Sequence, residues 1–262
     1  MRHRLNPIPE HSSSTLSPSK LLLALESRAL FEWLATPLAL PWLKRQCPLG
    51  DGHAVMVMPG LLAGDSSTAP LRRFLSTCGY QVQGWQQGRN LGPRAGVMAA
   101  LQRQLRELQS ASDGKISLIG WSLGGIFARE LARLQPEAVR QVISLGSPLY
   151  GEPQTSTNAW PLYQHISAGH PADVERGDCA PPVPTTSIFS RGDGVVGWRG
   201  SVETHGAQIC NIQLRSGSHL GLGVNPLVWW VLAERLAQAE HAWQPYNAQG
   251  LSRWLVSHYQ PR

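Results

Sequence analysis

The pentapeptide at residues 120–124 reads G-W-S-L-G, which is the spacing G-x-S-x-G with Ser122 at its centre. It follows the apolar run Ile116–Ile119 and precedes a stretch with helical spacing. In a strand–turn–helix of this kind, the serine hydroxyl projects from the sheet edge and the next backbone N–H groups point at a substrate oxygen. Alone, the pattern also fits an ordinary glycine-rich turn. With these flanks, it predicts that Ser122 is a nucleophile.

A serine nucleophile needs a histidine base, and the base needs a carboxylate that orients it. On a doubly wound sheet, the acid and then the histidine follow the serine, each on a loop after a strand. Asp193 lies on a glycine-flanked turn after a predicted strand that ends at Ser190, and His219 lies on a glycine-rich loop after the next one. Each alone also fits a plain turn residue. Together, in this order, they predict a triad of Ser122, Asp193 and His219.

Other side chains compete for these roles. His165 and His170, like Asp173 and Asp178, lie in a long loop without a strand to hold them, so we do not expect them to be the base or the acid. His205 is a further competitor for the base.

The carbonyl oxygen of a substrate needs backbone donors aimed at its developing charge. We expect these donors to be the N–H groups of Leu123 and of Leu61, the latter in the loop after the first strand. A simple glycine turn at Gly60 is the alternative.

Arg89 and Asn90 are candidates to contact a polar substrate group. For Arg89, a structural role in which its side chain bridges two loops is favoured over substrate contact. The candidates for the substrate pocket are Leu62, Trp121, Trp160, Arg89 and Asn90.

Short apolar runs alternate with helical patterns from residue 53 onward. This alternation predicts an α/β fold with a doubly wound, mostly parallel sheet of about six strands and helices on both faces. The predicted strands are Ala54–Met58, Tyr80–Trp85, Ile116–Gly120, Gln141–Leu145, Thr185–Ser190 and Ala207–Gln213. The predicted helices are Thr68–Thr77, Gly96–Leu108, Leu123–Leu134 and Leu227–Ala239.

The N-terminal region divides into a loose tail, residues 1–18, and a helical segment, residues 19–35. Glu26, Arg28 and Glu32 interrupt its apolar run too early for a secretion signal, which needs about 7–15 apolar residues. We therefore expect a cytoplasmic protein with an amphipathic helix packed on the domain, and contact with a membrane surface is the less favoured alternative. The residues expected on the packed face are Leu22, Leu25, Ala29, Leu30 and Leu34.

Residues 19–262 are expected to form one domain. Within it, residues 150–184 are too long and too rich in Gly, Pro, Ser and Thr for an ordinary connection. Apolar side chains such as Trp160 in this segment suggest a cap-like insertion over the site, and packing of the segment onto the core is the alternative.

The chain has 262 residues, of which 42% are hydrophobic and 15% charged, as in a globular domain. Its net charge of +6 comes from scattered basic residues, so no nucleic-acid partner is expected. The four cysteines show no metal-binding spacing, and we expect neither a metal nor a cofactor.

The chain resembles the α/β-hydrolase superfamily, in a compact branch similar to bacterial esterases and lipases, from about His53 to Ala239. Besides the serine motif, the resemblance rests on V-M-P-G-L at residues 57–61, L-G-S-P at 145–148, D-G-V-V at 193–196 and G-S-H at 217–219. It implies Ser122 as nucleophile, Asp193 as acid and His219 as base.

The chain departs from that family in two places. Pro59 and Gly60 stand where the commoner oxyanion phrase begins with His-Gly. The first two strands of larger members are replaced by the helical segment 19–35, which favours a trimmed sheet.

The predicted function is a serine hydrolase that cleaves a small-molecule carboxylic ester through an acyl-serine intermediate. An acyltransferase or a thioesterase on the same triad is an alternative, because only the acceptor or the leaving group differs. A non-catalytic binding module that kept the fold is another. No motif specifies an oligomeric state.

Overall fold

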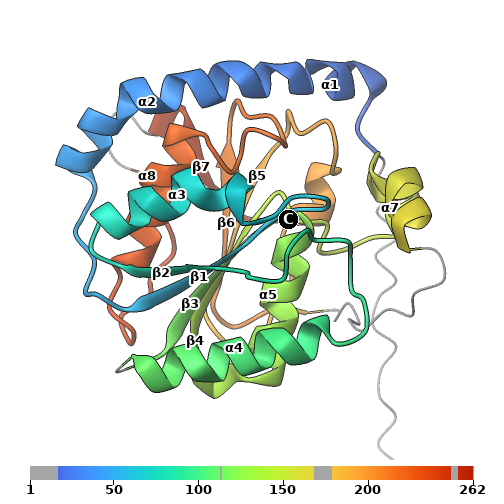
Figure 1. Cartoon of the computed structure of the whole chain (residues 1–262). Coiled ribbons are helices and arrows are strands. Elements are labelled where there is room, and N and C mark those ends of the chain that lie inside the picture. The colour runs from blue at the N-terminus through green and yellow to red at the C-terminus, as the bar shows by residue number, and fades with distance from the viewer. Residues whose placement is uncertain (1–16, 113, 168–178, 249–252, 262) are drawn as a thin grey trace, which may run out of the picture.

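The structure is a computed structural model that describes residues 17–112, 114–167, 179–248 and 253–261. Within these residues, a seven-stranded sheet of order β2-β1-β3-β4-β5-β6-β7 forms the centre of the molecule (Figure 1). All neighbouring strands pair in parallel except β7, which is antiparallel to β6. The strands are β1 (Ala54–Met58), β2 (Gln81–Gly84), β3 (Ile116–Trp121), β4 (Val139–Leu145), β5 (Thr185–Ser190), β6 (Ile209–Leu214) and β7 (Val256–Tyr259).

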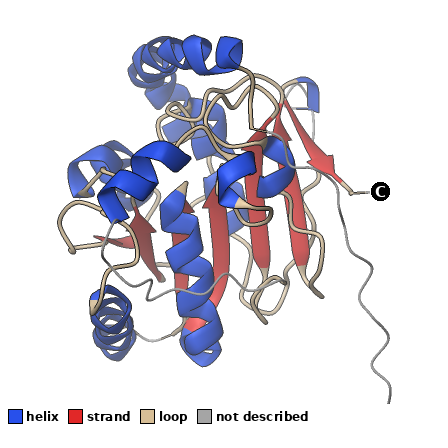
Figure 2. Ribbon diagram, turned by 90° about the vertical axis from the view of Figure 1, so that its right-hand side faces the viewer, coloured by secondary structure: helices blue, strands red, loops and turns tan. Residues whose placement is uncertain are grey.

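Helices cover both faces of this sheet, because its central strands are apolar on both sides. In β1, Val55 and Val57 pack toward α3 and α8, whereas Met56 and Met58 pack toward α4 and α5. Figure 2 shows the strands enclosed between these layers. The helices from residue 65 onward are α3 (Asp65–Thr77), α4 (Val97–Ala111), α5 (Leu123–Leu134), α6 (Pro153–Ser156), α7 (Trp160–Ser167) and α8 (Pro226–Leu236), with 3-10 turns η2 (Pro136–Ala138) and η3 (Trp198–Ser201). The predicted doubly wound α/β architecture is confirmed.

The start of α8 and the end of α5 follow local sequence signals. The side chain of Asn225 accepts a hydrogen bond from the N–H of Leu227 and caps α8, in which Pro226 is the first residue. Helix α5 ends at Leu134, as predicted from the proline that follows. Elements whose ends carry such signals are found within a few residues of their predicted bounds.

The sheet was predicted to have about six strands, and β7 extends it to seven. This four-residue edge strand is anchored by Tyr259, whose ring packs edge-on against Phe189 and Trp198. A short strand that contains serine and histidine has too little alternation to be recognised from sequence.

The N-terminal helical segment is longer than predicted, and a different side of it faces the domain. It comprises α1 (Lys20–Ala24), η1 (Leu25–Arg28) and α2 (Ala29–Gln46), and it runs along the top of the molecule in Figure 1. The predicted packed face is wrong, since Leu25, Leu30 and Leu34 are exposed. Instead, Glu26, Thr36 and Leu43 are buried against the domain.

The 150–184 segment contains α6 and α7, and residues 168–178 of it lie outside the described residues. Helix α7 lies against the loop after β2, where a Cβ at Gly92 would be 3.3 Å from the ring of Tyr163. The guanidinium of Arg94 also donates to the carbonyl of Ile166. Whether the segment acts as a cap stays a prediction.

Of the predicted N-terminal tail, residues 1–16 lie outside the described residues. Among the residues that are described, no helix is both long enough and apolar enough to cross a membrane.

Candidate active site

Ser122 lies on the turn between β3 and α5. Its φ of +53° is rare for a residue with a side chain, and the half-buried serine therefore sits on a strained turn. The glycines on either side allow this turn. A Cβ at Gly120 would come within 2.4 Å of the backbone of Gly124, and one at Gly124 within 2.4 Å of the carbonyl oxygen of Met58. The start of α5 can thus lie directly on the strand ends.

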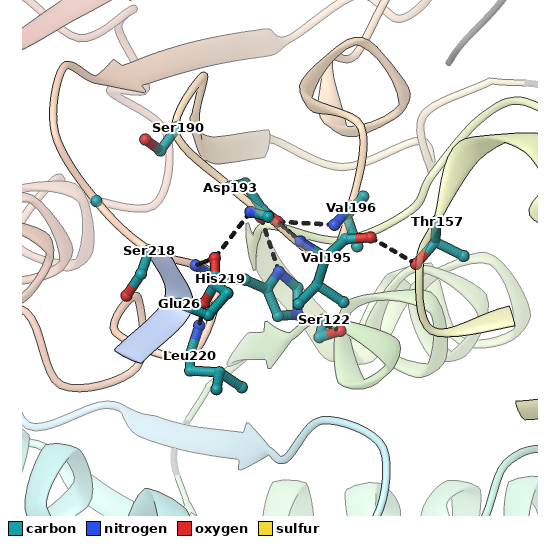
Figure 3. Close-up of polar contacts among 12 residues, drawn as sticks. Glu26, Ser122, Thr157, Ser190, Asp193, Val195, Val196, Ser218, His219 and Leu220 are labelled. Carbon is teal, nitrogen blue, oxygen red and sulfur yellow. Dashed lines mark hydrogen bonds and ion pairs between the residues drawn. The ribbon is translucent and has the colours of Figure 1, made fainter. Parts of the chain in front are cut away.

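His219 brings its ring to Ser122 from the loop between β6 and α8. Its Nε2 is 2.9 Å from Ser122 Oγ, and its Nδ1 is 2.7 Å from Asp193 Oδ2 (Figure 3). The indole N–H of Trp121 donates to the backbone carbonyl of His219 at 3.1 Å. The three residues singled out in the sequence are thus joined in one hydrogen-bonded chain.

Asp193 is held by its own loop after β5. Its Oδ1 accepts hydrogen bonds from the N–H groups of Val195 at 2.8 Å and Val196 at 2.7 Å, which leaves Oδ2 for His219. Both Asp193 and His219 are buried. Gly146, at the end of β4, makes room for the pair, since a Cβ there would lie 3.0 Å from Asp193 Oδ2 and 3.2 Å from His219 Nδ1.

The surroundings of His219 favour its protonated form. Burial of the ring acts to lower the pKa, but the charge of Asp193, its hydrogen bond and the more distant charge of Glu26 outweigh burial and raise the pKa above the usual value of 6.5. A histidine with a raised pKa can take a proton from a serine and hold it while charge develops on a substrate.

Glu26 is a site residue that the sequence analysis missed. It lies in η1, far from the triad along the chain, and its carboxylate is 5% exposed. Its Oε1 accepts from the N–H groups of Gly194 and His219, and its Oε2 accepts from that of Leu220, at 2.7–2.9 Å (Figure 3). One carboxylate therefore joins the loop of the acid to the loop of the histidine.

Two further charged residues of the same helical segment also form hydrogen bonds with the loops around the site. The guanidinium of Arg28 donates to the carbonyls of Gly192 and Gly217, which lie on the same two loops. Glu32 accepts from the N–H of Ser218 and from the side chain of Asn225. The signal available in the sequence was the i, i+4 spacing of the polar residues Arg28, Glu32 and Thr36 on one side of the helical segment.

The loop expected to supply the second oxyanion donor lies beside Ser122. A Cβ at Gly60 would be 3.3 Å from Ser122 Cβ. Asn90 is fully buried below this loop, where it donates to the carbonyl of Pro59 and accepts from the N–H of Gly92. These contacts give Asn90 a structural role in holding the loop, in place of the pocket role suggested from sequence.

The other pocket candidates take different positions. Trp121 is half-buried beside the histidine loop, and Leu62 is 40% exposed with a φ of +61°. Trp160 stacks on Tyr163 within α7, and Arg89 is exposed.

The competing histidines do not meet Ser122 in the described part of the chain. His165 and His205 are exposed, and His170, Asp173 and Asp178 lie outside the described residues. Among the residues that the structure describes, no group of three or more His, Cys, Asp or Glu side chains is arranged to hold a metal ion.

Residues 57–199, more than half of the chain, match the family defined by the alpha/beta hydrolase fold. The chain belongs to the alpha/beta hydrolase family. The matched range includes Ser122 and Asp193 and ends before His219, so the family match and the hydrogen bonds of His219 are independent observations. Membership of this family supports a hydrolase activity.

Several solved structures share the fold of this chain at low sequence identity. Lipase B from Aspergillus fumigatus superposes with a TM-score of 0.53 at 17% identity over 71% of this chain, which spans only 53% of that lipase. A pyrethroid hydrolase from Sphingobium faniae JZ-2 gives 0.52 at 19% identity, covering 71% of this chain and 96% of its own. A deformylase from Pseudomonas putida S16 gives 0.52 at 12% identity, covering 71% and 93%. No curated protein sequence matches the chain significantly.

Proposed function

We propose that this alpha/beta hydrolase is a serine hydrolase that cleaves a carboxylic ester through an acyl-serine intermediate. The observation that carries the proposal is the hydrogen-bonded chain Ser122–His219–Asp193, with the serine on a strained turn at the start of α5. A hydroxyl in that position has its base within 2.9 Å and the N-terminal end of a helix beside it.

In the first half-reaction, the Oγ of Ser122 attacks the ester carbonyl carbon while its proton passes to Nε2 of His219. Asp193 accepts the hydrogen bond of Nδ1 and stabilises the imidazolium that forms. The N–H groups of Leu123 and Leu61 would donate to the oxyanion. His219 then gives its proton to the departing alkoxide. An alcohol is released, and the acyl group stays on Ser122 as an ester.

In the second half-reaction, water takes the place of the alcohol. His219 removes a proton from the water, whose oxygen attacks the acyl carbon, and the proton returns to Ser122 Oγ as the carboxylic acid leaves. An alcohol, amine or thiol acceptor at this step would make the enzyme an acyltransferase, and the triad would be unchanged.

A small-molecule acyl ester suits the surroundings of Ser122. Leu62 and Trp121 contribute apolar surface next to the candidate oxyanion loop and the histidine loop. The fold is shared with an Aspergillus lipase and a Sphingobium pyrethroid hydrolase. Their sequence identity to this chain is too low to transfer their substrates to it. The ester class is therefore proposed mainly from the chemistry of the triad.

The proposal is tested by labelling the intact protein with a fluorophosphonate probe and mapping the modified residue by mass spectrometry. We expect label on Ser122, none on a Ser122→Ala variant, and undiminished label on Ser117→Ala, in which a serine at the other end of β3 is removed. Absence of label from folded wild-type protein, or label that persists in Ser122→Ala, would contradict it. Hydrolysis of a panel of acyl esters and thioesters then separates the leaving-group classes.

A further inference from the structure

The outward side of α2 carries an unusually apolar surface. Phe31 is 73% exposed and Leu38 is 84% exposed, and their neighbours on the same side are also open to solvent. We call this surface the outer helix face, and it comprises Leu30, Phe31, Trp33, Leu34, Leu38 and Trp42, the last of which also stacks its ring on Trp230 of α8. Scattered exposed leucines are ordinary, but a contiguous row of large apolar side chains marks an interaction surface.

The inward side of the same segment is polar where it meets the catalytic loops. Glu26 and Glu32 accept hydrogen bonds from loop N–H groups, and the hydroxyl of Thr36 donates to the carbonyl of Val224. A surface helix normally buries its apolar side and exposes its polar side. Here this arrangement is reversed near the site, so attachment to the domain does not require the outer helix face.

The exposed charged side chains at the two ends of this surface are basic. Glu26 and Glu32 are the two acidic residues between positions 17 and 50, and both are turned to the domain. Lys20, Lys44 and Arg45 are exposed at the two ends of the segment. Arg191 and Arg199 line a cavity with Leu22 at the α1 end, which also contains Asp193, whose carboxylate is engaged by His219. The outer helix face is thus flanked by cations.

We propose that the outer helix face docks α2 in the plane of an anionic phospholipid surface. Apolar side chains with tryptophans at the level of the headgroups, bordered by Lys and Arg, match such a surface. A second copy of this chain is disfavoured as the occupant, because it would bring two basic rims together. Since no helix in the described residues could cross a membrane, the segment lies on the surface and does not span it.

Docking would place the active-site edge of the sheet near the lipid. The segment holds the loops of Asp193 and His219 on its inward side, so these loops lie directly behind the docked helix. Binding itself does not depend on the chemistry proposed for Ser122. A Ser122→Ala variant is therefore expected to bind lipid like the wild type.

The experiment is co-sedimentation of the full-length protein with vesicles of phosphatidylcholine with or without phosphatidylglycerol. We expect binding that requires phosphatidylglycerol and weakens as salt is raised, because salt screens the basic rim. The triple variant Phe31→Gln, Leu34→Gln, Leu38→Gln should lose roughly tenfold or more in affinity, because it removes three large apolar groups. Leu134→Gln is the matched control, an exposed leucine at the far end of α5.

Circular dichroism and hydrolysis of a short-chain ester in vesicle-free buffer check that the triple variant keeps its fold and site. The proposal is overturned if wild-type protein does not bind the anionic vesicles, or if the triple variant binds as tightly as Leu134→Gln. It is also overturned if the triple variant only abolishes a concentration-dependent dimer seen by light scattering, because the occupant is then a second copy.

Discussion

Two serine–histidine–aspartate chains of hydrogen bonds lie at opposite ends of strand β3. At the carboxyl end, His219 joins Ser122 at 2.9 Å to Asp193 at 2.7 Å. At the amino end, His53 joins Ser117 at 2.8 Å to Asp51 at 2.5 Å. The distances alone do not distinguish the two.

The backbone around each serine does distinguish them. Ser117 is the second residue of β3, with extended neighbours on both sides, and it is 0% exposed. A cavity of about 450 Å³ at that edge is lined by Asp51 and His53 but not by Ser117. Ser122 stands half-buried on a turn at the start of a helix, beside the first backbone N–H groups of that helix, as the proposed reaction requires. A nucleophile needs that access as well as a base.

The charges around the two histidines also differ, because only His53 has a cation beside its ring. Burial lowers the pKa of His53, and Arg140, whose Nη1 is 3.1 Å from its Nδ1, lowers it further against the opposing effect of Asp51. Burial also acts on His219, but Asp193 and Glu26 raise its pKa above the usual value. The surroundings of His219 therefore favour its protonated form, and those of His53 disfavour it.

Removal of each serine gives the largest contrast. Ser122→Ala should lower kcat for ester hydrolysis by about a thousandfold to a millionfold, because nucleophile and base act as one unit. Ser117→Ala should leave kcat within about twofold, since its hydroxyl meets no substrate. Steady-state kinetics on the two purified variants measures both. A comparable loss in Ser117→Ala would break the distinction between the two chains.

Removal of the charge on each aspartate gives the next contrast. Asp193→Asn should cost up to about ten-thousandfold in kcat, because the amide favours the wrong tautomer of His219. Asp51→Asn should leave kcat nearly unchanged and alter the free energy of unfolding by about 1 kcal/mol, because the Asp51 side of its ion pair with the buried Arg140 is half exposed to solvent. Kinetics together with urea unfolding tests the pair. Equal rate losses in both variants would show that the amino-end chain takes part in catalysis.

The two histidines should make opposite contributions to stability as the pH changes. The folded pKa of His53 is lowered, so its contribution falls as the pH drops through about 6.5, where the unfolded histidine gains a proton first. The folded pKa of His219 is raised, so its contribution is fully present below about 6.5 and is lost as the pH rises through the folded pKa.

Urea unfolding of wild type, His53→Gln and His219→Gln from pH 5 to pH 8 separates the two contributions. The wild-type advantage over His53→Gln should shrink toward low pH, and the advantage over His219→Gln should shrink toward high pH. Parallel curves for the two variants would contradict the assigned directions.

The smallest expected effect comes from Glu26, the distant charge behind His219. Glu26→Gln should shift the acid limb of the kcat/KM profile to lower pH, because the charge that raises the pKa of His219 is removed, and should reduce kcat by no more than roughly tenfold. Glu32→Gln is the control on the same helical segment, since its carboxylate contacts the loop at Ser218. If both variants shift the pH profile equally, Glu26 acts by holding the loops in place and not through its charge on His219.

Most of the sheet and the order of the candidate site residues could be predicted from local signals. The bounds of β1 and β5 match the predicted strands, and the end of α5 and the start of α8 follow from Pro136 and Asn225. The strand β7 could not be predicted, because a four-residue edge strand depends on contacts such as that of Tyr259 with Phe189.

What the sequence alone determined was the motif at Ser122 and the positions of Asp193 and His219 on loops after strands. These follow from chain order and short-range spacing. Which side of the N-terminal helix meets the protein was decided only by the tertiary structure. The loops after β5 and β6 present buried N–H groups that need acceptors, and Glu26 satisfies three of them from more than 160 residues away. The spacing of hydrophobic residues in the helix cannot reveal that these N–H groups need acceptors, because they belong to a different part of the chain.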